Sequence, residues 1–158
     1  MSEIATNAAS ALYPLPAFYF KVIFTAILGV TDTSFQEVHG IGSEMETEEV
    51  VEGGENRFVH RLPTVMKHPQ LELKRGIAPI GSPLALWCKY TLESGYSLGV
   101  VPSLVMVYLL NADGQAVRCW SFSDAYPVKW EVDEFNSTKN DVAIETITLN
   151  YTCSNRIF

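Results

Sequence analysis

The sequence predicts a mainly β protein, an antiparallel β-barrel or sandwich with one amphipathic α-helix at about residues 83–94. Three observations lead to this fold class. Apolar residues alternate with a period of two over most of the chain, as they do in β-strands. Turn segments rich in glycine, asparagine and aspartate separate the alternating stretches. Apolar residues recur at helical spacing in only one convincing segment.

The first two predicted strands lie at residues 18–27 and 35–38, and two prolines before the first strand hold the backbone extended. Phe20, Val22 and Phe24 share one face of this strand by alternation. The opposite face is also half apolar, whereas a face in water is normally more polar. We therefore expect both faces of the first strand to be covered.

An acidic hairpin is predicted at residues 43–62. If it closes symmetrically about its Gly-Gly-Glu-Asn turn, Glu52 faces Arg57 and Glu48 faces Arg61 across the two strands. Each exposed pair of this kind contributes only about 0.2–1 kcal/mol. Because a hairpin this polar adds little to a core, we expect it to act as an arm laid over another surface.

A short strand at residues 71–74 precedes the predicted helix. Ser82 is a suitable N-cap, and the proline that follows it fits the first helical position. Leu84, Trp87 and Leu92 recur at helical spacing, so this face is expected to pack against a sheet. A glycine after the last of these residues supplies the C-terminal stop.

Four strands complete the prediction: residues 103–110, 115–122, 126–132 and 142–151. The first of them is apolar on both faces, and an Asn-Ala-Asp-Gly turn joins it to the second. Pro127 has no backbone N–H to donate and therefore has to lie at an end or an edge. Trp120 shares a strand face with Phe122, which favours a core position over a stacking platform.

The sequence carries no recognisable motif for catalysis, for a cofactor or for a metal. Its three histidines lack the spacing of a metal site, and its three cysteines fit neither a disulfide framework nor a zinc site. Cys88 lies on the apolar helix face, where packing is the expected role. No glycine-rich phosphate loop and no GxSxG segment occurs. We therefore expect no enzyme activity, no cofactor and no bound metal.

Charge and hydropathy limit the expected partners. The chain has 18 acidic and 11 basic side chains and a formal net charge of -7, which disfavours sequence-independent binding to nucleic acid. Its most apolar early stretch, residues 17–30, carries a lysine and is shorter than the roughly 20 residues that span a bilayer. The N-terminus lacks the basic region of a signal peptide. We expect no membrane anchoring and no specific nucleic-acid binding.

Several short segments occur in an order that is specific as a set. They are residues 14–18 (PLPAF), 35–40 (FQEVHG), 52–56 (EGGEN), 58–60 (FVH), 62–63 (LP), 73–76 (LKRG), 82–84 (SPL) with Trp87, 126–130 (YPVKW), and 143–146 (AIET) with Leu149. In this order the chain resembles the contractile-phage tail tube proteins, including inner-tube subunits of phage-tail-like contractile injection systems. These subunits are similar in fold to the secretion-system Hcp ring protein.

The resemblance implies a structural function. Subunits of this family form homo-hexameric rings that stack into a hollow tube, and sheath contraction propels the tube to deliver DNA or protein cargo. The implied partners are other copies of the chain, sheath subunits around the tube, and baseplate or spike and terminator or cap proteins at its ends. Assembly would take place in the bacterial cytoplasm, without a signal peptide, into a phage tail or a phage-tail-like particle that lysis releases.

The resemblance also divides the chain and marks candidate contact residues. It implies a tail-tube β-barrel domain at residues 14–151, and it leaves outside the matched core an N-terminal arm at residues 1–13, expected to be flexible, and a short C-terminal tail at residues 152–158. The acidic hairpin would reach a neighbouring subunit or the adjacent ring. The candidate contacts are Glu44, Glu46, Glu48, Glu52, Glu55, Arg57 and Arg61.

Two other functions stay open at the level of the sequence. One is a monomeric β-sandwich module that binds a glycan or peptide in a groove with Trp120 and Trp130. The other is a small hydrolase that uses the carboxylates of the acidic hairpin. The first predicts a monomer that binds a glycan, and the second predicts that neutralising the hairpin abolishes turnover rather than assembly.

Overall fold

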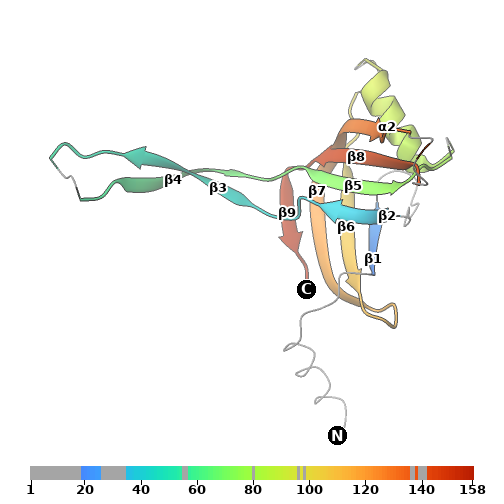
Figure 1. The fold of residues 1–158 in the computed structure, drawn as a ribbon, viewed down its shortest axis with the longest axis horizontal. Helices are drawn as coiled ribbons and strands as arrows, with labels where there is room; N and C mark the ends of the chain where they lie inside the picture. The colour runs from blue at the N-terminus through green and yellow to red at the C-terminus, as the bar shows by residue number, and fades with distance from the viewer. Residues whose placement is uncertain are drawn as a thin grey trace, which may run out of the picture.

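The computed structural model describes residues 19–25, 35–54, 57–79, 81–95, 97, 99–135, 138 and 142–158. Its elements are β1 (Phe20–Phe24), β2 (Phe35–His39), β3 (Glu44–Val50), β4 (His60–Lys67), β5 (Leu71–Gly76), α2 (Pro83–Glu93), β6 (Ser103–Leu110), β7 (Ala116–Val132), β8 (Ile144–Asn150) and β9 (Cys153–Arg156). Figure 1 shows a body of strands with the helix at one end and a long hairpin projecting from the other.

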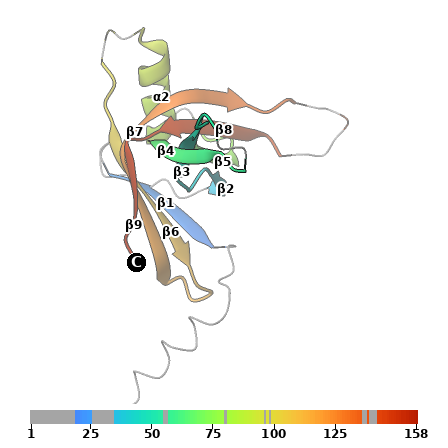
Figure 2. The ribbon, with the colours of Figure 1, turned by 90° about the vertical axis from the view of Figure 1, so that its left-hand side faces the viewer.

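The body consists of two antiparallel layers that share the long strand β7. Sheet A has the order β1-β6-β7-β9, and sheet B has the order β7-β8-β5-β2. The strands of sheet B run across those of sheet A (Figures 1 and 2). The mainly β fold is therefore confirmed, with one helix among the described residues, in the form of a sandwich whose described strands do not close a barrel.

Strand β7 passes from one sheet to the other at a bend near Asp124. Its pairing with β6 ends at Ala125, and its pairing with β8 begins at Tyr126. Asp124 has a φ of 53°, a left-handed conformation that aspartate tolerates better than most residues. Such bends allow one strand to turn the corner between crossed sheets.

The prediction of two separate strands at residues 115–122 and 126–132 is therefore wrong, because the structure has one strand, β7. Pro127 does not interrupt it. This proline pairs with β8 on one side at an irregular register, and no described strand lies along the other side of β7 beyond Ala125. The expectation of an edge position for Pro127 is confirmed.

The core fills the space between the inner faces of the two sheets. Its fully buried side chains include Val22, Leu71, Leu73, Val105, Phe122, Ile147 and Leu149. In β1 and β6 only the inner face is covered within one chain, and side chains on the second face, such as Ile23 and Met106, are half-buried. The expected cover for that second face therefore does not come from the described part of the same chain.

Helix α2 closes one end of the sandwich. Trp87 packs against the Phe24 ring with 6.0 Å between centroids, and its indole N–H donates to the Val101 carbonyl at 3.0 Å. The helix is confirmed with Ser82 as its N-cap residue and proline at its first position, although the Ser82 side chain makes no capping hydrogen bond and its hydroxyl accepts from Arg75. One detail of the predicted apolar face is wrong. Leu92 is 39% exposed, whereas Cys88, also expected on that face, is buried.

The two chain ends differ in how much is described. Residues 1–13, the predicted flexible arm, lie outside the described residues. Residues 152–158, predicted as a short tail, contain β9, which extends sheet A along β7. A polar Cys-Ser-Asn-Arg strand shows no apolar alternation, so the pattern used elsewhere in the chain does not reveal it.

Gly40, at the base of the hairpin, is required by close packing as well as by backbone conformation. Its φ is 87°, and an added Cβ would lie 1.8 Å from the Gln70 backbone oxygen. Gly114 has a similar φ of 78° but open space around it. We predict that Gly40→Ala destabilises the fold by about 1–3 kcal/mol more than Gly114→Ala, measured by urea denaturation. Equal losses would show that backbone strain alone matters at both positions.

Candidate assembly surfaces

The hairpin of β3 and β4 is an arm, defined here as residues 44–67, that makes no core of its own. Every described residue of both strands is exposed. The two strands form a separate two-stranded sheet that pairs with no other described strand. Figure 1 shows this arm extending far from the body. An isolated two-stranded hairpin is at best marginally stable in water, so the arm is suited to packing on another molecule.

The charge pairing of the arm differs from the prediction by one residue. Arg61 lies opposite Glu49 and donates to its carboxylate at 3.1 Å, whereas Glu48 lies opposite Leu62. The predicted pair of Glu48 and Arg61 is therefore wrong. The predicted pair of Glu52 and Arg57 lies beyond the last paired residues of the two strands and stays a prediction, and Glu52 lies 3.8 Å from the imidazole of His60. The prediction assumes a tight turn, but the two strands end further apart in sequence than a tight turn allows. The register of the strands is shifted by one residue, and such a shift moves each side chain to the opposite face of the hairpin.

A second ion pair lies at the base of the arm. Lys67 donates to the Glu46 carboxylate, and this contact raises the pKa of Lys67 above its ordinary value. A β-bulge between Met45 and Thr47 accompanies it. Sequence reasoning missed Glu49 and Lys67 as pairing residues because a correct register was needed to find them.

The candidate contact residues are all on the arm and all exposed where the structure describes them. They are Glu44, Glu46, Glu48, Glu52, Arg57 and Arg61, and Glu55 lies outside the described residues. The sequence-based prediction does not single out the exposed apolar side chains that lie on the same arm. These are Met45, Val50, Val51, Phe58, Val59, Leu62, Val65 and Met66. Mixed apolar and charged surface of this kind is typical of protein interfaces.

The outer face of sheet B is polar and carries nearly balanced charge. Glu37 accepts from Lys74 at 3.2 Å and from His39 at 3.1 Å, and these two contacts, led by His39, lower the pKa of Glu37. Lys129 and Glu131 form another pair at 2.7 Å. The outer face of sheet A differs, since half-buried apolar side chains dominate it in β1 and β6.

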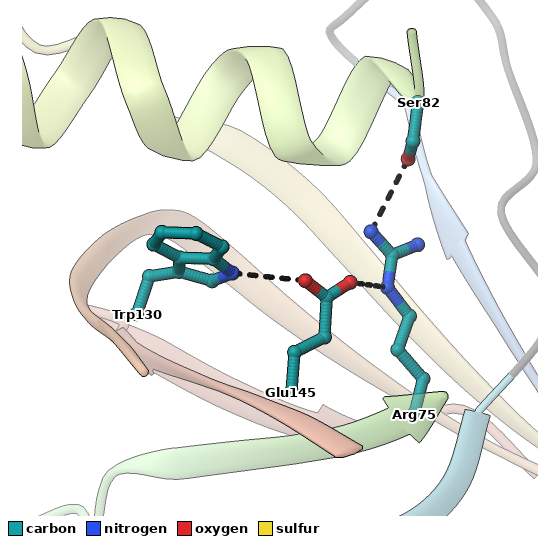
Figure 3. Close-up of polar contacts among 4 residues, drawn as sticks. All are labelled: Arg75, Ser82, Trp130 and Glu145. Carbon is teal, nitrogen blue, oxygen red and sulfur yellow. Dashed lines mark hydrogen bonds and ion pairs between the residues drawn. The ribbon is translucent and has the colours of Figure 1, made fainter. Parts of the chain in front are cut away.

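A buried ion pair ties the helix end of the sandwich together (Figure 3). Arg75 of β5 donates from Nε to Glu145 of β8, and both side chains are almost fully buried. Trp130 donates its indole N–H to the other carboxylate oxygen at 3.0 Å. Arg75 also donates from a terminal nitrogen to the Ser82 hydroxyl at 3.2 Å, which links sheet B to the start of α2.

A pocket of about 330 Å³ lies beside this ion pair, between α2 and the end of β7. We call it the α2 pocket. Its lining includes Ile77, Leu86, Cys88, Leu92, Trp130 and Val132. Burial raises the pKa of Cys88 to about 12, so its thiol is protonated at neutral pH and is no nucleophile.

The structure does not bring together the residues of the two alternative functions. Trp120 lines a different pocket from Trp130, at the other end of the sandwich with Phe20 and Val107. Within the described ranges these two pockets share no lining residue, so neither of them uses both tryptophans. The arm carboxylates line none of the described pockets, and among the described residues no group of three or more acidic, histidine or cysteine side chains could hold a metal ion.

Within the described ranges, no helix has the length and hydropathy needed to span a bilayer. The known proteins that resemble this chain agree with the two-sheet fold. Hcp1 from Flavobacterium johnsoniae matches with a TM-score of 0.53 at 12% identity, covering 89% of this chain and 95% of that one. The fold is therefore Hcp-like. Among curated proteins, none gives a significant match.

More similar structures come from contractile injection systems. A chain in the 6-fold symmetrised baseplate of the anti-feeding prophage (AFP) has a TM-score of 0.80 and 28% identity, covering 92% of this chain and 96% of that one. A chain in the PVC sheath-tube complex in the extended state has a TM-score of 0.77 and 24% identity, covering 96% of both chains. The protein belongs to the T4-like virus tail tube protein gp19 family, whose sequence pattern matches residues 16–155.

The buried ion pair provides a stability test. Glu145→Gln leaves the Arg75 guanidinium without its carboxylate in a dry site, and we expect a loss of about 3–5 kcal/mol in the free energy of unfolding. Glu131→Gln removes a carboxylate from an exposed pair on the same sheet and should cost less than about 1 kcal/mol. Chemical denaturation of both variants measures the difference, and similar small losses would contradict a structural role for the buried pair.

Proposed function

We propose that this protein is a structural subunit of the inner tube of a contractile tail or contractile injection system. In this proposal its copies form homo-hexameric rings, the rings stack into a hollow tube, and a contracting sheath propels the tube to deliver DNA or protein cargo. The family membership and the AFP relative in a 6-fold symmetrised structure support it. The observation that carries it furthest is the pair of open edges on sheet B.

Sheet B ends in two strands without an outer partner among the described residues. One is β2, and the other is the second half of β7 beyond Ala125. Unpaired backbone donors and acceptors on such edges favour pairing with another strand. Because the four strands alternate in direction, β2 and this half of β7 run antiparallel to each other. A rotated copy can therefore continue the sheet without breaking the antiparallel pattern, and repetition closes a ring.

The polar outer face of sheet B is the face we assign to the bore. A channel filled with water needs a hydrophilic wall, and this face supplies paired charges with little net excess. The apolar outer face of sheet A is better suited to contacts with other subunits. Paired charges would also limit the binding of passing cargo of either sign.

The arm is the proposed connection between copies. Its candidate contacts, Glu44, Glu46, Glu48, Glu52, Glu55, Arg57 and Arg61, would meet a neighbouring subunit or the adjacent ring. Sheath subunits around the tube and baseplate or cap proteins at its ends are further proposed partners, supported by the sheath-tube, baseplate and cap assemblies that contain similar chains.

We also propose that the protein has no enzymatic activity. Support comes from the protonated, buried Cys88 and from the arm carboxylates, which line no described pocket. A tube subunit needs stiffness and open edges rather than a reaction centre.

Blocking one edge of sheet B tests ring formation. The Asp133 N–H donates to Ile144 of β8 at 2.9 Å, and alternation along the strand then directs the Val132 N–H toward the open edge. Val132→Pro removes that donor, so we expect a folded monomer that no longer forms rings. Val132→Thr keeps the donor and should form them.

Native mass spectrometry and negative-stain electron microscopy measure the rings, and circular dichroism checks the fold. Rings of unchanged abundance from Val132→Pro would show that this edge is not the junction. A parent protein that stays strictly monomeric at high concentration would overturn the proposed function itself.

A further inference from the structure

The α2 pocket is shaped for an apolar side chain rather than for a soluble ligand. At about 330 Å³ it is at the small end of the range for ligand sites. Its walls are mainly apolar, and the carboxylate of Glu145 within it is already engaged by Arg75 and Trp130. Lys89 and Glu93 are the remaining charged residues of its lining.

The end of the arm carries apolar side chains that the chain itself leaves exposed. Phe58 is 57% exposed, and its ring contacts the imidazole of His60 at 4.9 Å between centroids. Val59, the next residue, and Val51, which follows β3 on the other side of the arm, are also exposed. Phe58 lies just before β4 begins at His60, on an arm without a core, and a large aromatic side chain in such a place gains most by entering a pocket on another molecule.

The arm and the α2 pocket lie at opposite ends of the same strand. Strand β5 begins at Leu71, next to the base of the arm, and ends at Gly76, directly before the pocket residue Ile77. Figure 1 shows the arm leaving one side of the body and α2 on the other. The arm therefore points away from the pocket of its own chain.

A donor surface at one end and an acceptor at the other produce a head-to-tail contact. Such a contact repeats from copy to copy and builds an open-ended stack, whereas a surface that binds itself closes a dimer. The head-to-tail contact would repeat along the direction of the strands of sheet B. The open edges of that sheet would instead join copies sideways, across the strands, and so close a ring.

We propose that the arm of one copy inserts Phe58 into the α2 pocket of a copy in the next ring. The Phe58 ring packs there against Trp130 and Leu92, and Lys89 at the rim faces the acidic arm. This assignment rests on the proposed tube function and names the contact that stacks the rings. The copy that donates its arm thus supplies the side chain that fills the pocket of the other copy.

Disulfide trapping tests the contact directly. The variant Phe58→Cys/Leu92→Cys is made in a Cys88→Ala/Cys153→Ser background, which removes the native cysteine of the pocket and the exposed one. It is assembled and oxidised with diamide, which takes up the two thiol hydrogens for each disulfide formed. Apart from the buried Cys119, each copy then has one donor and one acceptor thiol. We expect a ladder of two, three and more linked chains on a non-reducing gel.

Two matched variants control for chance collisions. Phe58→Cys alone, in the same background without Cys88 and Cys153, can form no more than dimers. Phe58→Cys/Tyr90→Cys places the second thiol on an exposed residue of α2 outside the pocket lining and should give much less ladder. A ladder of equal strength from the Tyr90 variant would overturn the assignment to the pocket.

Stack length gives a second readout. Phe58→Glu should leave rings intact but shorten stacks by roughly tenfold or more, because a charged side chain cannot enter the apolar pocket, while Phe58→Leu should retain them. Stacks of normal length from Phe58→Glu, with no ladder from the cysteine pair, would overturn this inference and leave the tube function standing. Absence of rings from the parent protein would instead remove the tube function.

Discussion

Strand β7 is the element on which the rest of the structure depends, because it belongs to both sheets. Its bend at Asp124 lets the first half pair in sheet A and the second half in sheet B. In the first half β6 and β9 cover both edges, whereas β8 is the one described strand beside the second half. The same bend that holds the sandwich together therefore leaves an unsatisfied backbone edge, and backbone groups of this kind favour further pairing.

The buried pair of Arg75 and Glu145 has a different role at the helix end. A charge pair inside a protein stabilises little relative to apolar packing, since both groups lose their hydration. It does fix geometry, because the carboxylate can serve the guanidinium and the Trp130 indole only in one arrangement. Through Ser82 the pair also sets where α2 begins, and hence where the α2 pocket lies.

How far the sequence predicts this structure depends on whether a feature is local. Helix α2 follows from an N-terminal Ser-Pro and helical apolar spacing, and β6 follows from strict alternation. The continuity of β7 does not follow from the sequence. Pro127 breaks a strand unless it lies at an open edge of a sheet, and which strands lie at an edge is decided only by the tertiary structure. The register of the arm and the polar strand β9 likewise depend on partners distant in the sequence. The sequence places the candidate contact residues on one hairpin, but their cross-strand pairing and the α2 pocket at the other end of the body are visible only in the three-dimensional structure.

The two ends of the molecule are chemically different, since the arm leaves the body only where β5 begins. A filament built from such units by simple translation has polarity. Its leading terminus would present bare hairpins and its trailing terminus vacant pockets, so the proteins that close the two termini must recognise unlike surfaces. Elongation would also differ in rate between the termini, which allows an organism to set where the filament starts and which way it grows.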